Sequence, residues 1–163
     1  MIGNDVIDLS LAKHESSPFR KGYLEKTCST NERDYILNDQ NPEFAFWKLW
    51  SRKEAVYKLL RQLGATRGYY PIRIENTNPE LGWVTFEERT FYTKSFYEGE
   101  CMHTIALQSP ECNNFIDLDN SIKIFKKGEI PFIKFRNKTV PISKSHHGRF
   151  EKLVALKKDL TLK

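Results

Sequence analysis

One long run of helical pattern, residues 43–63, constrains the fold of this chain more than any other feature. Pro42 suits the first turn of such a helix, where a missing amide hydrogen does no harm. Gly64 suits its end, where the backbone often turns left-handed. Because a helix of this length has to bury an apolar side, we expect an antiparallel sheet to pack against it.

The chain ahead of this helix begins with a strand pattern and then becomes helical. Residues 2–9 alternate with β character and predict a strand. Residues 10–38 look helical in pieces, one of which starts at a cap on Ser29 or Thr30 with Glu32 in its first turn. The helical elements therefore gather in the first half of the chain.

After Gly68 the pattern changes to short β-rich runs separated by turn residues. These runs are YYPIRIE, GWVTFEERTFYT, MHTIALQ, IKIFKKGEIPFIKF, KTVPISKS and FEKLVAL. Helices first and strands later indicate an α+β fold, not a β-α-β repeat. We expect one domain over residues 1–155 and a basic tail over residues 156–163.

Composition and charge limit the partners and the compartment. The 163 residues, of which 39% are hydrophobic, suffice for one domain with a core, and the net charge of +5 favours an anionic partner. Three cysteines do not make a disulfide framework, so we expect reduced thiols and a cytoplasmic protein. The opening MIGNDVIDLSLAKHESS lacks the pattern of a signal peptide, and no apolar run is long enough to predict a membrane span.

The stretch WSRKEAVYKLL places a lysine where the long helix should be apolar. Lys53 has Leu49 and Trp50 one turn before it and Val56 and Tyr57 one turn after it. A lysine in such a stripe either extends its ammonium group to solvent or meets a specific anion. The stretch therefore marks a candidate site on the helix.

Asp5, Glu54 and Lys58 would together suit a metal and a phosphate. Mg2+ usually takes one or two carboxylates from a protein and fills its shell with water and phosphate oxygens. Asp5 and Glu54 would supply these carboxylates, and Lys58 would neutralise further phosphate charge. Asp8 points to the other face of the strand, because it lies three residues after Asp5. A surface ion pair between Glu54 and Lys58, at i and i+4, is the simpler explanation of the spacing.

The late segment PISKSHHGRF combines small and basic side chains. On a strand, Ser143 and Ser145 face one way and His146 the other. The serines would let a ligand approach closely, and His146, His147 and Arg149 can donate hydrogen bonds to phosphate. A polar strand end that leads into a turn would look the same.

Basic residues also stand among aromatic residues along the chain, as they do in proteins that bind single-stranded nucleic acid. Core packing explains most of these aromatic positions. The sequence has no RNP motif, zinc finger or Gly-rich Walker loop. A basic nucleic-acid-binding module is therefore an alternative function that no motif supports.

Three segments, in this order, carry a family resemblance: IGNDVIDL, WSRKEAVYK and VPISKSHHGRF. They are similar to a G-x-D opening with following aliphatics and an acid, to aromatic-small-x-K-E-A-x-x-K, and to a late S-x-S-H strand. Together they resemble the 4'-phosphopantetheinyl transferase superfamily, most closely the short holo-acyl-carrier-protein synthase form. CSTNE and KKGEIPFI resemble two further segments of that family. The resemblance spans residues 1 to about 155 and is least clear over residues 72–120.

The resemblance implies an Mg2+-dependent transfer of the 4'-phosphopantetheine arm of coenzyme A to a serine of an acidic apo acyl carrier protein, with release of 3',5'-ADP. Asp5, Glu54 and Lys58 would be the catalytic residues. Asp5 and Glu54 would bind the metal, Lys58 would bind phosphate, and Glu54 would also suit the role of base. Ser145 and His146 would line the coenzyme A pocket.

The resemblance also bears on Lys53, which matches the lysine of K-E-A. Lys53 would contact the phosphates of coenzyme A, or would lock the helix to an acid such as Asp8. A third alternative is that the Lys53 ammonium group simply extends to solvent.

Three positions depart from the family pattern. Asn4 stands where an aliphatic residue or threonine is usual, Leu11 where the short form commonly has arginine, and Ile7 where the long form has an acid. Because Ile7 leaves out the third side-chain metal ligand of the long form, the match favours the short form. Short forms look like trimers with sites between subunits, and we expect a homo-oligomer, a trimer before a dimer. A family member that has lost catalysis and only binds coenzyme A or a carrier protein is a further alternative.

Overall fold

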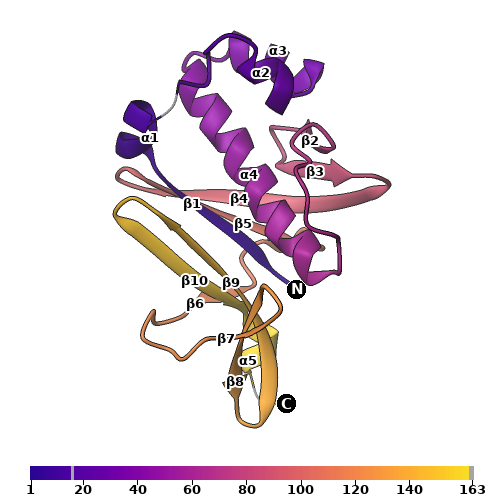
Figure 1. The fold of residues 1–163 in the computed structure, drawn as a ribbon, viewed down its shortest axis with the longest axis vertical. Coiled ribbons are helices and arrows are strands. Elements are labelled where there is room, and N and C mark those ends of the chain that lie inside the picture. The colour runs from indigo at the N-terminus through magenta and orange to yellow at the C-terminus, as the bar shows by residue number, and fades with distance from the viewer. Residues whose placement is uncertain (16, 162–163) are drawn as a thin grey trace.

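The computed structural model describes residues 1–15 and 17–161, which form five helices and ten strands (Figure 1). In chain order the elements are β1 (Gly3–Asp8), α1 (Leu9–Glu15), α2 (Tyr23–Thr27), α3 (Thr30–Asn38), α4 (Pro42–Gln62), β2 (Ile74–Asn78), β3 (Trp83–Phe86), β4 (Arg89–Glu98), β5 (Cys101–Leu107), β6 (Phe115–Asp117), β7 (Phe125–Lys127), β8 (Ile130–Phe135), β9 (Lys138–His147), β10 (Phe150–Leu156) and α5 (Lys157–Leu160).

The strands form two antiparallel sheets of five strands each. The first has the order β1-β5-β4-β3-β2 and the second the order β6-β10-β9-β8-β7. Helix α4 lies across the first sheet, where β1 and β5 are its main neighbours (Figure 1). The predicted α+β class, with an antiparallel sheet against a long helix, is confirmed.

Local signals fix both ends of α4. The side chain of Asn41 accepts a hydrogen bond from the Phe44 amide at 3.1 Å, Pro42 occupies the first turn, and Gly64 has a left-handed φ of 95° just past the end. For α3 the structure decides between the two predicted caps. Ser29 is the cap, and Glu32 closes a capping box with it.

A glycine lets β1 and α4 touch along their backbones. A Cβ atom on Gly3 would lie only 1.9 Å from the carbonyl oxygen of Ala55, so no larger residue fits there without moving the helix. Asp5 follows two residues later and therefore faces the same side of β1. This close contact brings the Asp5 carboxylate beneath α4.

Side chains of β9 join the second sheet to the open edge of β1. Alternate amides of β1 donate to alternate side chains of β9: Asn4 N–H to Ser143 Oγ at 2.9 Å, Val6 N–H to Ser145 Oγ at 3.1 Å and Asp8 N–H to His147 Nδ1 at 2.9 Å. The predicted common facing of the two serines is confirmed. These bonds also satisfy an edge that would otherwise be unpaired.

One predicted strand was wrong in its extent. The run YYPIRIE becomes a strand only at Ile74, because the chain first makes a turn in which the Ile74 amide donates to Tyr70 O at 2.9 Å. Residues 72–120, where the resemblance is least clear, hold β2 to β6 and so most of the first sheet. Within the predicted tail, Lys157–Leu160 form α5, and residues 162–163 lie outside the described chain. Among the described helices none is both long and apolar enough to cross a membrane.

Candidate active site

Three side chains from three elements meet where the two sheets and α4 come together. Lys58 on α4 donates to Asp5 Oδ1 on β1 at 3.1 Å and to Ser145 Oγ on β9 at 2.9 Å. The Ser145 hydroxyl donates to the same Asp5 oxygen at 3.0 Å. The surface ion pair between Glu54 and Lys58 is therefore not what the structure forms, because Lys58 pairs with Asp5.

Glu54 stands one helical turn before Lys58 and is partly buried. Among the described residues it makes no hydrogen bond or ion pair, although Asp5 and Lys58 lie near enough to influence its charge. Burial, and then repulsion by Asp5, raise the pKa of Glu54 to about 7, and attraction to Lys58 opposes this only in part. The structure thus brings together Asp5, Glu54, Lys58 and Ser145.

These two carboxylates fit a divalent cation. The Glu54 carboxylate has no donor to satisfy it and lies beside Asp5, a like charge that a cation would neutralise. Over residues 1–15 and 17–161 there is no cluster of three or more His, Cys, Asp or Glu side chains suited to a metal. Two carboxylates beside each other are a donor set that Mg2+ accepts, since it keeps water and phosphate oxygens as further ligands.

A cavity of about 740 Å3 opens beside this cluster, and Lys58, Ser145 and His146 all line it. His146 is exposed on the face of β9 opposite to Ser145. Further basic residues of the wall are Arg61, Arg67, Lys126 and Lys144. The size and charge of this cavity suit a large polyanionic ligand.

Our sequence reasoning missed the other basic residues of the wall. Arg61 lies three residues after Lys58 on α4, so helical spacing alone would have found it. Glu129, between β7 and β8, accepts from Arg61 at 3.2 Å and from Arg67 at 2.7 Å. These bonds attach the β7–β8 hairpin to the end of α4, and no signal in the sequence indicates them.

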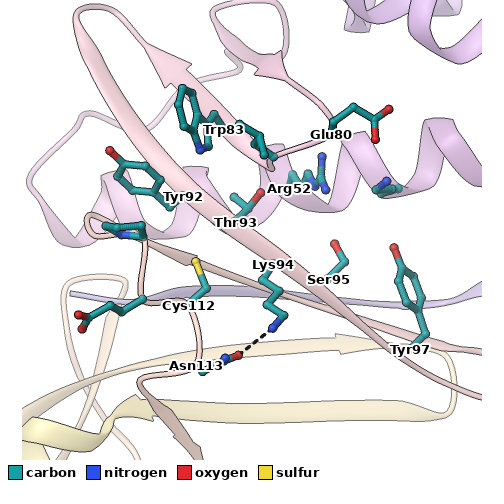
Figure 2. Close-up of a pocket in the computed structure, with 14 residues that line it drawn as sticks. Arg52, Glu80, Trp83, Tyr92, Thr93, Lys94, Ser95, Tyr97, Cys112 and Asn113 are labelled. Carbon is teal, nitrogen blue, oxygen red and sulfur yellow. Dashed lines mark hydrogen bonds between the residues drawn. The ribbon is translucent and has the colours of Figure 1, made fainter.

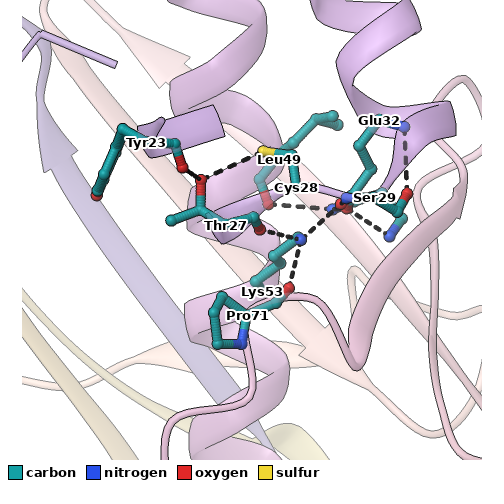
Figure 3. Close-up of polar contacts among 9 residues, drawn as sticks. Tyr23, Thr27, Cys28, Ser29, Glu32, Leu49, Lys53 and Pro71 are labelled. Carbon is teal, nitrogen blue, oxygen red and sulfur yellow. Dashed lines mark hydrogen bonds and ion pairs between the residues drawn. The ribbon is translucent and has the colours of Figure 1, made fainter. Parts of the chain in front are cut away.

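Lys53 lies apart from this cluster, buried on another side of α4 (Figure 3). Its ammonium group donates to Thr27 O at 2.8 Å, Glu32 Oε2 at 2.6 Å and Pro71 O at 2.5 Å, which uses all three of its hydrogens. The side chain is only 3% exposed. The expectations that the Lys53 ammonium group reaches solvent or pairs with Asp8 are therefore wrong. Its N–H groups are all engaged, so none is left to donate to a phosphate. The lysine does lock the helix, and the acid is Glu32.

Glu32 connects this lysine to the surrounding elements. Its Oε2 also accepts from the Ser29 amide at 2.9 Å, and its Oε1 accepts from the amide and the side chain of Asn76 at 2.8 Å each (Figure 3). One fully buried carboxylate therefore joins α3, α4 and β2. Because Glu54 is the residue next to Lys53, this network fixes the rotation of α4 that points Glu54 toward Asp5.

Asp8 has a structural partner of its own. Arg149 binds it with two hydrogen bonds, Nε to Oδ2 at 2.8 Å and Nη2 to Oδ1 at 2.7 Å, and these hold the pKa of Asp8 well below its ordinary value. Arg149 also contacts Glu100, and His147 lies between the Asp8 amide and Glu15. Arg149 and His147, which the sequence suggested for phosphate, therefore bind protein groups around the turn between β9 and β10.

Asn4, which departs from the family pattern, contacts a second buried polar residue. Its Nδ2 lies 3.3 Å from His103 Nε2 and donates to Lys152 O at 3.2 Å. Burial lowers the pKa of His103 to about 4, so this imidazole is neutral at pH 7. The pair occupies the face of β1 opposite to Asp5.

Helix α4 packs on the first sheet and brings Glu54 and Lys58 beside Asp5 of β1, next to a basic cavity that suits a polyanionic ligand. A family model described as the 4'-phosphopantetheinyl transferase superfamily matches residues 1–108 of the 163. The chain belongs to this superfamily, and is a phosphopantetheinyl transferase by family, with coenzyme A as the substrate that its members use. A comparison with curated proteins gives no match. Asp5, Glu54 and Lys58 lie inside the matched region, whereas Ser145 and His146 come from the part of the chain beyond it.

Proposed function

We propose that this protein transfers the 4'-phosphopantetheine arm of coenzyme A to a serine of an apo acyl carrier protein, with Mg2+, and releases 3',5'-ADP. The observation that carries the proposal is the convergence of Asp5, Glu54 and Lys58 beside the basic cavity. Both carboxylates and the lysine occupy the positions that match the family motifs. A carrier that is acidic suits the net charge of +5.

In the proposed reaction the serine hydroxyl attacks the β-phosphorus of coenzyme A. The new P–O bond forms on the serine as the bond from that phosphorus to the bridging oxygen breaks, and 3',5'-ADP leaves with that oxygen. Such transfers depend on positioning and on charge stabilisation more than on covalent chemistry by the protein. The residues of the site are therefore assigned by charge and by free hydrogen-bonding capacity.

Lys58 would exchange its bond to Asp5 for phosphate oxygens, which concentrate negative charge in the transition state. Mg2+, held by Asp5 and Glu54, would supply further positive charge at the pyrophosphate. Glu54 would accept the serine proton, because it has no hydrogen bond of its own, whereas Asp5 is engaged by Lys58 and Ser145. Ser145 would hold Asp5 in place, and His146 would contact coenzyme A at the cavity wall.

The resemblance to the short synthase form supports a homo-oligomer, with a trimer favoured over a dimer. Light scattering after size-exclusion chromatography measures this directly. A mass of one chain under assay conditions would contradict it. Whether the acceptor serves fatty-acid, polyketide or peptide synthesis has to be found with a panel of carriers.

The transfer is tested by intact-mass measurement of apo carrier proteins after incubation with this protein, coenzyme A and Mg2+. We expect a mass gain of one phosphopantetheine arm on at least one carrier, and loss of the gain with EDTA. Glu54→Gln should abolish it, while Glu88→Gln, at an exposed position on the turn before β4, should not. No gain on any carrier, together with no binding of coenzyme A, would contradict the proposal and favour the nucleic-acid-binding alternative.

A further inference from the structure

A second cavity lies beside β4, on a different side of α4 from Glu54 and Lys58. Strand β3 pairs with β4 only as far as Tyr92, so the rest of β4 pairs with β5 alone. The free edge of β4, α4, the β2–β3 loop and the loop after β5 surround a cavity of about 430 Å3 (Figure 2). This volume falls in the range of small-molecule sites, and the cavity shares no residue with the transferase cluster.

Basic side chains without carboxylate partners line this cavity. Lys48, Arg52 and Lys94 face it, and among the described residues none of them forms an ion pair. Two acids, Glu80 and Glu111, also line it, so the formal charge is +1. Glu80 acts on Lys48 and Arg52 from beyond ion-pair distance. The cavity therefore has one positive charge in excess, and within the described part of the chain no carboxylate lies at ion-pair distance from its three basic side chains.

Arg52 is the most unusual member of this set, because it is only 4% exposed. Its Nη1 donates to Pro79 O at 2.6 Å, but its buried Nε has no partner and Nη2 makes no hydrogen bond within the described part of the chain. Burial of an unpaired guanidinium is unfavourable. The Nε–Nη2 edge is the one that binds a carboxylate or phosphate with two parallel hydrogen bonds.

The remaining walls offer amides and aromatic surface. The Thr93 amide donates across the strand edge to Gly82 O at 2.8 Å, and by the alternation of a strand the amides of Ser95 and Tyr97 point to the same, open side. Trp83 stands edge-to-face to Tyr92 at 6.2 Å and is 41% exposed (Figure 2). An apolar or aromatic group could pack there while its anion reached the basic side chains.

We infer that this cavity binds a small organic anion, a phosphate monoester or a carboxylate on an aromatic body, with Arg52 as its two-fold donor, Lys48 one helical turn before it and Lys94 on the other face of β4. The binding is separate from the transferase reaction. Nothing in it depends on Mg2+ or on coenzyme A.

Isothermal titration calorimetry of the full chain with EDTA present tests this inference, with phenyl phosphate and benzoate as probes and phenol as the neutral control. We expect saturable binding of at least one anion and none of phenol. Arg52→Gln should weaken the binding by about tenfold or more, because it removes a charge-assisted pair of hydrogen bonds. Lys138→Gln, at an exposed position on β9, should leave it unchanged.

The variants also separate this site from the transferase site, which could take phosphate as well. Loss of binding in Lys58→Gln but not in Arg52→Gln would overturn the inference, and so would the absence of saturable binding of both anions. If Arg52→Gln does not melt cooperatively, Lys48→Gln and Lys94→Gln take its place, and each should weaken the binding several-fold. Unchanged binding in both of them would also overturn the inference.

Discussion

Glu54 lowers the stability of the metal-free protein, and replacing it with glutamine should therefore stabilise the fold. Burial and Asp5 raise the pKa of Glu54 from its ordinary 4.5 to about 7 in the folded state. In the unfolded chain the carboxyl group regains its ordinary value. Because a tenfold change in an acid constant corresponds to about 1.4 kcal/mol, the ionised carboxylate destabilises the fold by about 3 kcal/mol.

This penalty depends on pH in a defined direction. Between pH 4.5 and about 7 the folded state keeps the Glu54 proton while the unfolded state loses it, so the free energy of unfolding falls as the pH rises. Above about pH 7 both states are ionised and the full penalty is present. Glutamine is neutral at every pH. The stabilisation by Glu54→Gln should therefore be near zero at pH 4.5 and reach about 3 kcal/mol at pH 8.

Urea denaturation of both proteins in EDTA, at pH 4.5 and at pH 8, measures this difference. Groups that titrate in both proteins cancel in the comparison. Glu88→Gln, at an exposed position, should change neither value. Mg2+ at pH 8 should stabilise the natural protein but not Glu54→Gln, because the proposed metal site of the folded state would use this carboxylate. A stability difference that is the same at both pH values, or a variant that is less stable at pH 8, would refute the reasoning.

Four further single substitutions test the fold around the site. Lys53→Met should lower the free energy of unfolding by about 3 kcal/mol or more in urea denaturation, because the buried Glu32 carboxylate would lose its cation. The double variant Glu32→Gln/Lys53→Met should regain part of this stability, and a double variant no more stable than Lys53→Met would contradict the reasoning. Gly3→Ala should lower the free energy of unfolding by more than about 2 kcal/mol in the same assay, since its Cβ would lie 1.9 Å from a backbone oxygen of α4, and a near-neutral effect would contradict the close contact. Ser145→Ala and Ser143→Ala should each lower the free energy of unfolding by about 1–2 kcal/mol, because each leaves a β1 amide without its hydrogen-bond acceptor. Only Ser145 also donates to Asp5, so equal rates of arm transfer in the two variants would contradict its role at Asp5.

Local signals predicted those elements of the fold that depend on local chemistry. Helix α4 was expected over residues 43–63 and occupies Pro42–Gln62, because its apolar period lies within the helix and its cap residues directly beside it. The run that begins at Tyr69 was predicted as a strand throughout. Instead, the ring of Tyr70 packs against Tyr57 and Phe86, and the backbone at Tyr70 pairs with no strand. Composition favoured a strand there, and packing against α4 decided the outcome.

The residues of the candidate site could also be predicted only in part. Asp5, Glu54, Lys58 and Ser145 were named from motifs, and the register of β1, α4 and β9 brings them together. The partner of Lys53 could not be predicted, because Glu32 lies 21 residues away and only the docking of α3 on α4 selects it among the acids of the chain.

The central claim is that Asp5, Glu54 and Lys58 act as one transferase centre. The rate of arm transfer from coenzyme A to an apo carrier protein, followed by intact mass and by release of 3',5'-ADP, tests it most directly. Glu54→Gln and Lys58→Gln should each reduce this rate at least about a hundredfold. Lys58→Gln removes positive charge that would stabilise the transition state, and Glu54→Gln removes the proposed metal ligand and base. Glu88→Gln and Lys138→Gln, at exposed positions, should retain the full rate. Equal amounts of modified carrier and 3',5'-ADP from the natural protein would support the account, whereas undiminished transfer in both site variants would contradict it.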